Sequence, residues 1–212
     1  MQKMLIATQN IGKQKEIFAL LSELNLELVT PGQLGLSLKI EENGKNYKVN
    51  ATKKAKAYST ASGLFTLADD SGLEVKALGG KPGVFSARYS QKPDATDKDR
   101  RSYLLHELKS MPKPWRAEFV CVVAIHTPVG KTYYAEGRCQ GWIIAGERGD
   151  NGFGYDPIFM VENLDSTMAE LSMEMKNKIS HRAHAINSIK PALIKLIEDS
   201  TTGLKTENFP LE

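Results

Sequence analysis

Apolar and polar residues follow two patterns along this chain. Short apolar runs predict buried strands, and apolar residues three or four positions apart predict amphipathic helices. The N-terminal segment reads as a strand, a helix and a second strand, which is the opening of an α/β fold. Predicted strands cover residues 3–7, 26–29, 64–68, 116–127 and 131–144, and predicted helices cover 13–24, 50–61, 96–108 and 181–198.

These elements predict a mixed central sheet flanked by helices. The last two strands form a long hairpin around the turn 128–130, which we expect to build a second lobe with a ligand cleft between the two lobes. The capping box Thr167-x-x-Glu170 predicts a short helix, and Pro191 is expected to kink the last one. One domain over residues 1–198 and a flexible tail over 199–212 are expected.

Composition places the chain among ordinary globular proteins. Of its 212 residues, 41% are hydrophobic and 25% charged, which excludes a disordered, collagen-like or rod-like chain. There is no apolar run of membrane-spanning length and no signal-peptide core, so a cytoplasmic location without membrane partners is expected. The net charge of +3 does not indicate nucleic-acid binding, and Cys121 and Cys139 are expected to be reduced, packed thiols.

Two polar segments follow predicted strands and carry candidate chemistry. Thr8-x-Asn10-x-x-Lys13-x-x-Glu16 opens a helix, where backbone N–H groups and a lysine favour an anion; a plain helix cap is the alternative. Asp69 and Asp70 stand at the predicted end of a buried strand. Because side chains alternate along a strand, one aspartate would face a metal and a water while the other anchors the turn. Two solvated turn residues are the alternative.

Further carboxylates and a helix face could complete such a site. Magnesium needs only one or two protein carboxylates beside substrate phosphates, and Glu41-Glu42 lies on a loop. Asn50 and Lys54 share one face of the next helix and would support a polyphosphate. A solvated loop and an exposed helix face are the plain alternatives.

Two later segments suit the binding of a flat ring. In the run from Gly152 to Pro157, two aromatics alternate with glycines that allow close backbone approach, although aromatics packed into the core are the alternative. Lys176 and Ser180-His181-Arg182 gather at the start of the last helix. Basic residues are unfavourable there against the helix dipole, which favours a functional reason over a plain cap.

Taken together, the segments resemble the bacterial form of the inosine triphosphatase family, the non-canonical purine NTP pyrophosphatases. The resemblance covers residues 1 to about 198 in the family's order. It implies a hydrolase that converts ITP, dITP and XTP to the monophosphate and pyrophosphate and so removes deaminated purines from the nucleotide pool. An elongated α/β fold, Mg²⁺ dependence and a homodimer are also implied. The matching strings are residues 7–13, 68–73, 78–83, 86–89, 152–159 and 179–182.

The resemblance also implies roles for single residues, position by position. Asp70 would be the general base and a metal ligand, with Ser71 on the substrate. Glu41 matches the second metal-binding carboxylate, with the adjacent Glu42 left as an alternative. The triphosphate would be bound by Thr8, Gln9, Asn10, Ile11, Gly12 and Lys13, and the base pocket lined by Phe153, Gly154, Tyr155, Asp156, Lys176, His181 and Arg182.

Two positions depart from the family's pattern. Val49 stands where bacterial relatives usually carry glutamate, which leaves the cleft one acid short. Gln9 replaces a small residue, often glycine, and is expected to narrow the phosphate loop. Two other functions stay open: a pyrimidine nucleotide pyrophosphatase of the septum-inhibitor type, and a non-catalytic nucleotide- or RNA-binding module with steeply salt-dependent binding.

Overall fold

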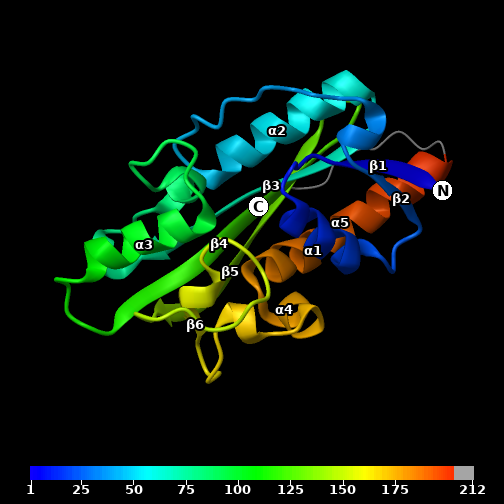
Figure 1. The fold of residues 1–212 in the computed structure, drawn as a ribbon. Helices are drawn as coiled ribbons and strands as arrows, with labels where there is room; N and C mark the ends of the chain where they lie inside the picture. Colours follow the sequence, from blue (N-terminus) through cyan, green and yellow to red (C-terminus); the bar gives the residue numbers. More distant parts are fainter. Residues whose placement is uncertain (203–212) are drawn as a thin grey trace.

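A six-stranded mixed sheet forms the centre of the protein (Figure 1). The computed structural model describes residues 1–202. The strand order is β2-β1-β3-β4-β5-β6; β1 runs parallel to β2 and β3, and the strands from β3 to β6 pair antiparallel. The strands are β1 (Gln2–Ile6), β2 (Leu26–Val29), β3 (Phe65–Val75), β4 (Trp115–His126), β5 (Thr132–Ile143) and β6 (Phe159–Val161).

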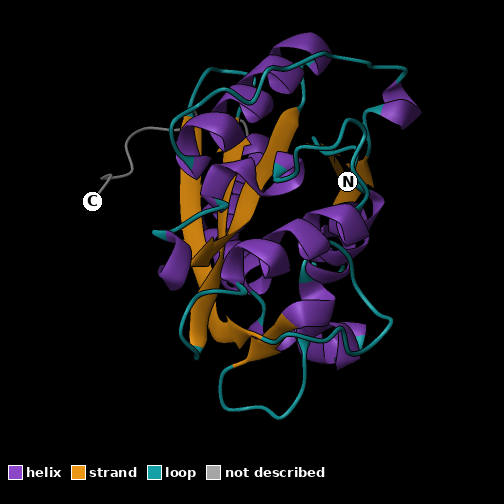
Figure 2. Ribbon diagram, turned by 60° about the vertical axis from the view of Figure 1, so that its left-hand side comes forward, coloured by secondary structure: helices purple, strands orange, loops and turns teal. Residues whose placement is uncertain are grey.

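Helices cover both faces of this sheet (Figure 1). Helices α1, α4 and α5 lie on one face, α2 covers the other, and α3 packs near the far end of the long strands. The long strands run the length of the molecule and give it an elongated shape (Figure 2). The helices are α1 (Ile11–Leu21), α2 (Tyr47–Ser62), α3 (Asp97–Leu108), α4 (Met173–Ile179) and α5 (His181–Thr202), with 3₁₀ turns η1 (Gly32–Leu34), η2 (Lys76–Leu78), η3 (Gly83–Arg88), η4 (Asp156–Ile158) and η5 (Met168–Glu170).

Side-chain alternation along the strands builds a core on each face of the sheet. Met4 and Ile6 of β1 pack with α1 and α5, whereas Leu5 and Ala7 pack with α2. A third apolar cluster joins α3 to β6 and the chain around Ile158 at the other end of the sheet. The predicted mixed sheet flanked by helices is therefore confirmed, and the site described below lies between the apolar clusters.

One strand boundary was predicted wrongly. We expected the third strand to end at residue 68, but β3 continues to Val75. Asp69 and Asp70 pair in register with Val123 and Val122 of the buried strand β4. This ladder with β4 holds polar residues in extended form, although the same residues favour a turn when their partner strand is not known.

Other elements agree with the predictions apart from their ends. The hairpin of β4 and β5 and the capping box of Thr167 and Glu170 are confirmed. Helix α2 begins earlier than expected, because the side chain of Asn46 accepts a hydrogen bond from the N–H of Val49 and caps it. Helix α5 contains Pro191 and continues to Thr202, past the expected end at residue 198. The remainder of the predicted tail, residues 203–212, lies outside the described residues.

The structure also bears on the cysteines and on membrane insertion. Cys121 and Cys139 are free and buried, as expected from their apolar surroundings in the sequence. Among residues 1–202, no helix combines the length and the apolar character that a membrane crossing requires.

Candidate active site

The candidate site is a cavity of about 310 Å³ beside the middle of β3. β1 pairs with β3 only as far as Ile6 and Leu67, and η3 meets β3 again where the Leu73 N–H donates to Ser86 Oγ at 2.9 Å. Between these two contacts the edge of β3 opens into the cavity. Segments far apart in sequence line it: Thr8, Gln9, Asn10, Lys13, Glu42, Lys54, Asp70, Ser71, Asp97, Arg100, Phe153, Gly154, Tyr155, Asp156, Lys176, His181 and Arg182 among others.

The two adjacent aspartates face opposite sides of the sheet, as their alternation predicts. Asp69 is fully buried toward α1 and α5, where it binds Lys13 Nζ at 3.0 Å and Arg182 Nη2 at 2.9 Å. Burial alone would raise the pKa of Asp69, but these two cations hold it well below its usual value. Asp69 is therefore an ionised anchor for both helices.

Asp70 points the other way, toward α2. Its Oδ2 accepts a hydrogen bond from Asn50 Nδ2 at 2.9 Å. Burial raises the pKa of Asp70; the charges of Lys54 and Lys13 and the Asn50 hydrogen bond oppose this, and Glu42 adds to it. Among residues 1–202, no cation pairs with Asp70 as Lys13 and Arg182 pair with Asp69, and Asp70 lines the cavity. A carboxyl group with a raised pKa at this place is suited to accept a proton.

The structure separates Glu42 from Glu41. Glu42 lines the cavity and pairs with Lys54 Nζ at 2.8 Å. The Glu41 carboxylate instead accepts a 3.3 Å hydrogen bond from the exposed Asn43, and Glu41 is not among the residues that line the cavity. Neighbouring side chains on an extended loop point in opposite directions. Of the two glutamates, Glu42 is the one that lies at the cavity, although the family resemblance matched Glu41 and left Glu42 as the alternative.

The first loop places its polar groups at the start of α1. Asn10 Oδ1 accepts from the Lys13 N–H at 3.0 Å and caps the helix, and Thr8, Gln9 and Asn10 line the cavity. Ile11 is 61% exposed and lies outside the lining. Gly12 is also absent from it, because the Phe153 ring covers this residue: a Cβ there would lie 2.4 Å from the ring.

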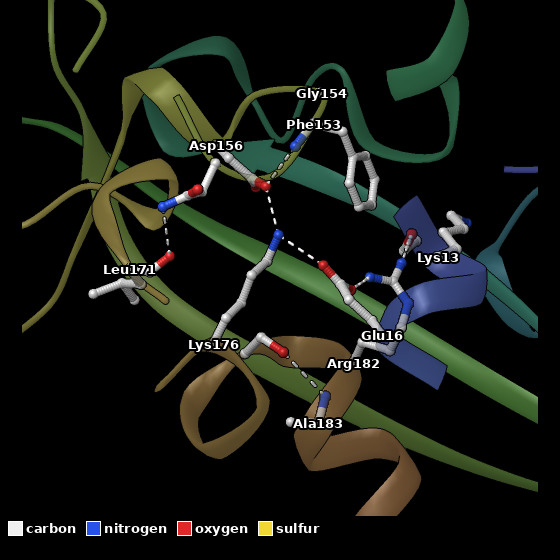
Figure 3. A network of polar contacts seen from close by, with 12 residues as sticks. Lys13, Glu16, Phe153, Gly154, Asp156, Leu171, Lys176, Arg182 and Ala183 are labelled. Atoms are coloured by element: carbon white, nitrogen blue, oxygen red, sulfur yellow. Dashed lines mark hydrogen bonds and ion pairs between the residues drawn. The ribbon is translucent and has the colours of Figure 1, made fainter. Parts of the chain in front are cut away.

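An aromatic ring and a buried ion network line the cavity beside the start of α1 (Figure 3). Lys176 Nζ lies between Asp156 at 2.6 Å and Glu16 at 2.7 Å. The same lysine is 4.9 Å from the centroid of the Phe153 ring, and the Phe153 N–H donates to Asp156 at 2.9 Å. The predicted pocket residues of this loop and of α4 are thereby brought together.

The Arg182 side chain is bound within this network and is not a free donor. Its guanidinium is almost fully buried and donates to Glu16, to Asp69 at 2.9 Å and to Ser71 Oγ at 3.0 Å. We expected donors near this residue to read the base. Since its side chain is bound to acids within the protein, its direct effect is on the placement of Ser71 and Asp69.

His181 lies beside Arg182 and remains neutral. Its ring stacks on Phe119 with centroids 4.8 Å apart, and its Nδ1 is buried without a hydrogen-bond partner in the described part of the chain. Burial lowers the pKa of His181 well below its usual value, and the charges of Arg182 and Lys176 lower it further. A neutral imidazole carries one N–H donor and one acceptor nitrogen, and His181 lines the cavity.

Sequence reasoning gave no role to several residues of the site. Glu16 ends the first sequence motif without an assigned function, and in the structure it joins Lys176 to Arg182. It lies four residues before the buried Leu20, on the same face of α1. Asp97 and Arg100 of α3 line the cavity, and no motif points to them. Asn50 and Lys54 were predicted to share a helix face. In the structure Asn50 donates a hydrogen bond to Asp70, and Lys54 pairs with Glu42.

The fold and cavity define a class: an α/β protein whose cleft is lined by lysines, carboxylates and an aromatic ring. A sequence profile described as the Ham1 family matches residues 4–192, and the chain belongs to that family.

Similar proteins cover almost the same length. A dITP/XTP pyrophosphatase from Geobacter sulfurreducens is 45% identical over 194 residues, 91% of this chain and 97% of the relative. One from Bacillus subtilis is 42% identical over 196 residues, with 91% and 98% covered. Among solved structures, the Staphylococcus aureus Ham1 protein has a TM-score of 0.81 at 38% identity and covers 92% of this chain and all of its own.

Proposed function

We propose that this protein is a nucleoside triphosphate pyrophosphatase that hydrolyses ITP, dITP and XTP to the monophosphate and pyrophosphate. Its role would be the removal of deaminated purines from the nucleotide pool. The observation that carries the proposal is Asp70, a carboxylate with a raised pKa in a cavity that is also lined by lysines and by Phe153. The names of the similar proteins support the same activity.

Two lysines and the start of α1 would take the triphosphate. Lys13 and Lys54 line the cavity, together with Thr8, Gln9 and Asn10 at the start of α1. Helix N-termini and lysines both favour phosphate oxygens. Gly12 serves the site indirectly, because its missing side chain makes room for the Phe153 ring.

The carboxylates fit a magnesium ion. Asp70 and Glu42 line the same cavity, and the Glu42 charge raises the pKa of Asp70, so a divalent cation between them would relieve an unfavourable pair. Oxygen ligands of this kind are the ones magnesium prefers. We propose Asp70 and Glu42, rather than Glu41, as its protein ligands. When bound, magnesium would neutralise charge on the phosphate oxygens.

Asp70 would act as the general base. It would take a proton from a water that attacks the α-phosphorus, so that a new phosphorus–oxygen bond forms while the bond to the bridging oxygen of pyrophosphate breaks. Lys13 and Lys54 would stabilise the charge on the departing pyrophosphate. Ser71, held by Arg182 at 3.0 Å, would orient the substrate beside this carboxylate.

The Phe153 ring would stack on the purine. The Phe153 ring offers a flat apolar face, and Lys176 and the neutral His181 line the cavity beside it. The N–H of the imidazole matches the 6-oxo acceptor of hypoxanthine and xanthine and would be left unpaired against the 6-amino group of adenine. We further propose a cytoplasmic homodimer, as the family resemblance implies.

The test is pyrophosphate release from ITP, dITP, XTP, GTP, ATP and dUTP, with magnesium and with a chelator. We expect strong release from the first three, little from GTP and ATP, and none in the chelator. Turnover of dUTP above that of ITP would favour a pyrimidine nucleotide pyrophosphatase. Absence of turnover on every nucleotide would refute the enzymatic function and favour a nucleotide- or RNA-binding module.

A further inference from the structure

The first turn of α3 holds the backbone of Gly154, the residue after Phe153 in the cavity wall. The Gly154 N–H donates to Asp97 Oδ2 at 2.8 Å, and the Gly154 carbonyl accepts from Arg101 Nη1 at 2.8 Å. Asp97 and Arg101 are four residues apart and share one helix face. Both polar groups of one loop glycine are therefore bound by a single helix.

Arg101 also binds a second point of the same loop. Its Nε and Nη2 donate to the two carboxylate oxygens of Glu147 at 3.0 and 2.9 Å. Two parallel hydrogen bonds of this kind match the planar fork of a guanidinium and fix its orientation. The Arg101 side chain is only 11% exposed. One guanidinium thus ties Glu147 and Gly154 to α3.

Helix α3 is itself firmly placed. Leu104 and Leu108 are fully buried, and the Thr96–Asp99 capping box closes its N-terminus. Arg100 binds the other carboxylate oxygen of Asp97. Burial would raise the pKa of Asp97, but the hydrogen bonds from Arg100 and the Gly154 N–H hold it below its usual value. The anchor is therefore ionised and rigid at neutral pH.

The held loop needs such an anchor, because its own backbone is permissive. Gly149, Gly152 and Gly154 all adopt positive φ angles of 82°, 78° and 62°. Glycine reaches this region without steric cost and loses the most conformational entropy when it is fixed there. Any shift at Gly154 moves the adjacent Phe153 ring, which packs directly over Gly12.

We propose that Asp97 and Arg101 are positioning residues that fix Phe153 against the flat base of the substrate and so determine base affinity. The proposal rests on the proposed function and adds two residues of α3 to it. Neither residue needs to touch the base, since each acts through the Gly154 peptide.

The test compares Arg101→Gln and Arg101→Lys with a control, Arg116→Lys. The control alters an ion pair with Glu162, at 2.8 Å and largely exposed, that lies outside the cavity. Both variants at residue 101 should raise KM for dITP about tenfold, because the guanidinium's hydrogen bond to the Gly154 carbonyl and its paired bonds to Glu147 are lost. We expect kcat to change by less than about twofold, because Asp70 and its surroundings are untouched.

Two further measurements separate positioning from other roles. Inhibition by inorganic tripolyphosphate, which has no base, should keep its wild-type constant in both variants. Amide hydrogen exchange in peptides covering Gly154 should become faster in both variants and stay unchanged in the control.

The outcomes are distinct. An unchanged KM for dITP in Arg101→Gln would overturn the proposal, and so would a KM rescued by lysine, since charge alone would then suffice. Equal weakening of tripolyphosphate and dITP would indicate general loss of structure and would also overturn it. If the wild-type protein hydrolyses no nucleotide, the proposed function fails first, whereas the exchange experiment still tests the clamp on Gly154.

Discussion

Gly12 is the position at which one methyl group tests the placement of the Phe153 ring. In Gly12→Ala the new Cβ would lie 2.4 Å from Phe153 Cδ1 and 2.7 Å from Cε1. Ordinary van der Waals contact begins at 3.4 Å, so the nearer ring atom must withdraw by 1.0 Å. The ring, and not the helix, should move, because α1 is fixed by its buried residues Ile17 and Leu21.

The substitution is expected to affect catalysis more than stability. A displacement of about 1 Å in a positioning group can cost about 100-fold in rate. We therefore expect kcat/KM for dITP and XTP to fall by about 10- to 100-fold in Gly12→Ala. Alanine is a better helix former than glycine by at most about 1 kcal/mol. This gain offsets part of the free energy needed to displace the ring, so we expect little change in the thermal midpoint.

The assay is steady-state pyrophosphate release, read beside thermal unfolding. Gly32→Ala is the matched control, because Gly32 also lies in a helical turn and a Cβ there meets nothing within 4 Å. The control should keep the wild-type kcat/KM. Wild-type kcat/KM in Gly12→Ala, with the fold intact, would refute the placement of Phe153 over α1.

Three further changes test the carboxylates and the neutral histidine. Asp70→Asn should lower kcat by about 10²- to 10⁴-fold. It should not lower the thermal midpoint, because the raised pKa of Asp70 means that burial disfavours its ionised form. Near-normal turnover would exclude Asp70 as the base. Glu42→Gln should weaken magnesium binding in calorimetry whereas Glu41→Gln should not, and the reverse would restore Glu41 as the ligand. His181 has a lowered pKa in the folded protein, so its contribution to stability is present above pH 6.5 and is lost as the pH falls. Between pH 6.5 and 5.5 the wild type should lose about 1 kcal/mol more unfolding free energy than His181→Gln; parallel curves in urea unfolding would contradict a neutral buried ring.

The parts of the fold that follow local periodicity could be predicted from the sequence. The apolar spacing of Ile17, Leu20 and Leu21 predicts the buried face of α1, which is confirmed. The long hairpin is predictable for the same reason, because two apolar runs flank one short turn. Such patterns report which face of an element is buried, and this holds whatever the element packs against.

The end of β3 could not be predicted in this way. Asp69-Asp70-Ser71-Gly72 consists of residues that favour turns, and their extended form comes from pairing with β4, which lies about fifty residues away in the sequence. The same limit applies to charge partners. Arg182 binds Glu16, 166 residues away, and Asp69, 113 residues away, so no local pattern shows that its guanidinium is already bound.

The continuation of β3 explains how two identical neighbouring side chains obtain different chemistry. In a turn, both aspartates would be solvated and would titrate alike. In a strand, alternation directs Asp69 toward the cations of α1 and α5, which hold its pKa low, and directs Asp70 toward α2 and the cavity, where burial raises its pKa. Pairs of titratable groups whose environments push their pKa values apart are typical of sites that need one fixed charge and one proton acceptor. The strand boundary that local sequence reasoning misplaced is therefore the feature that suits Asp70, and not Asp69, to the proposed role of general base.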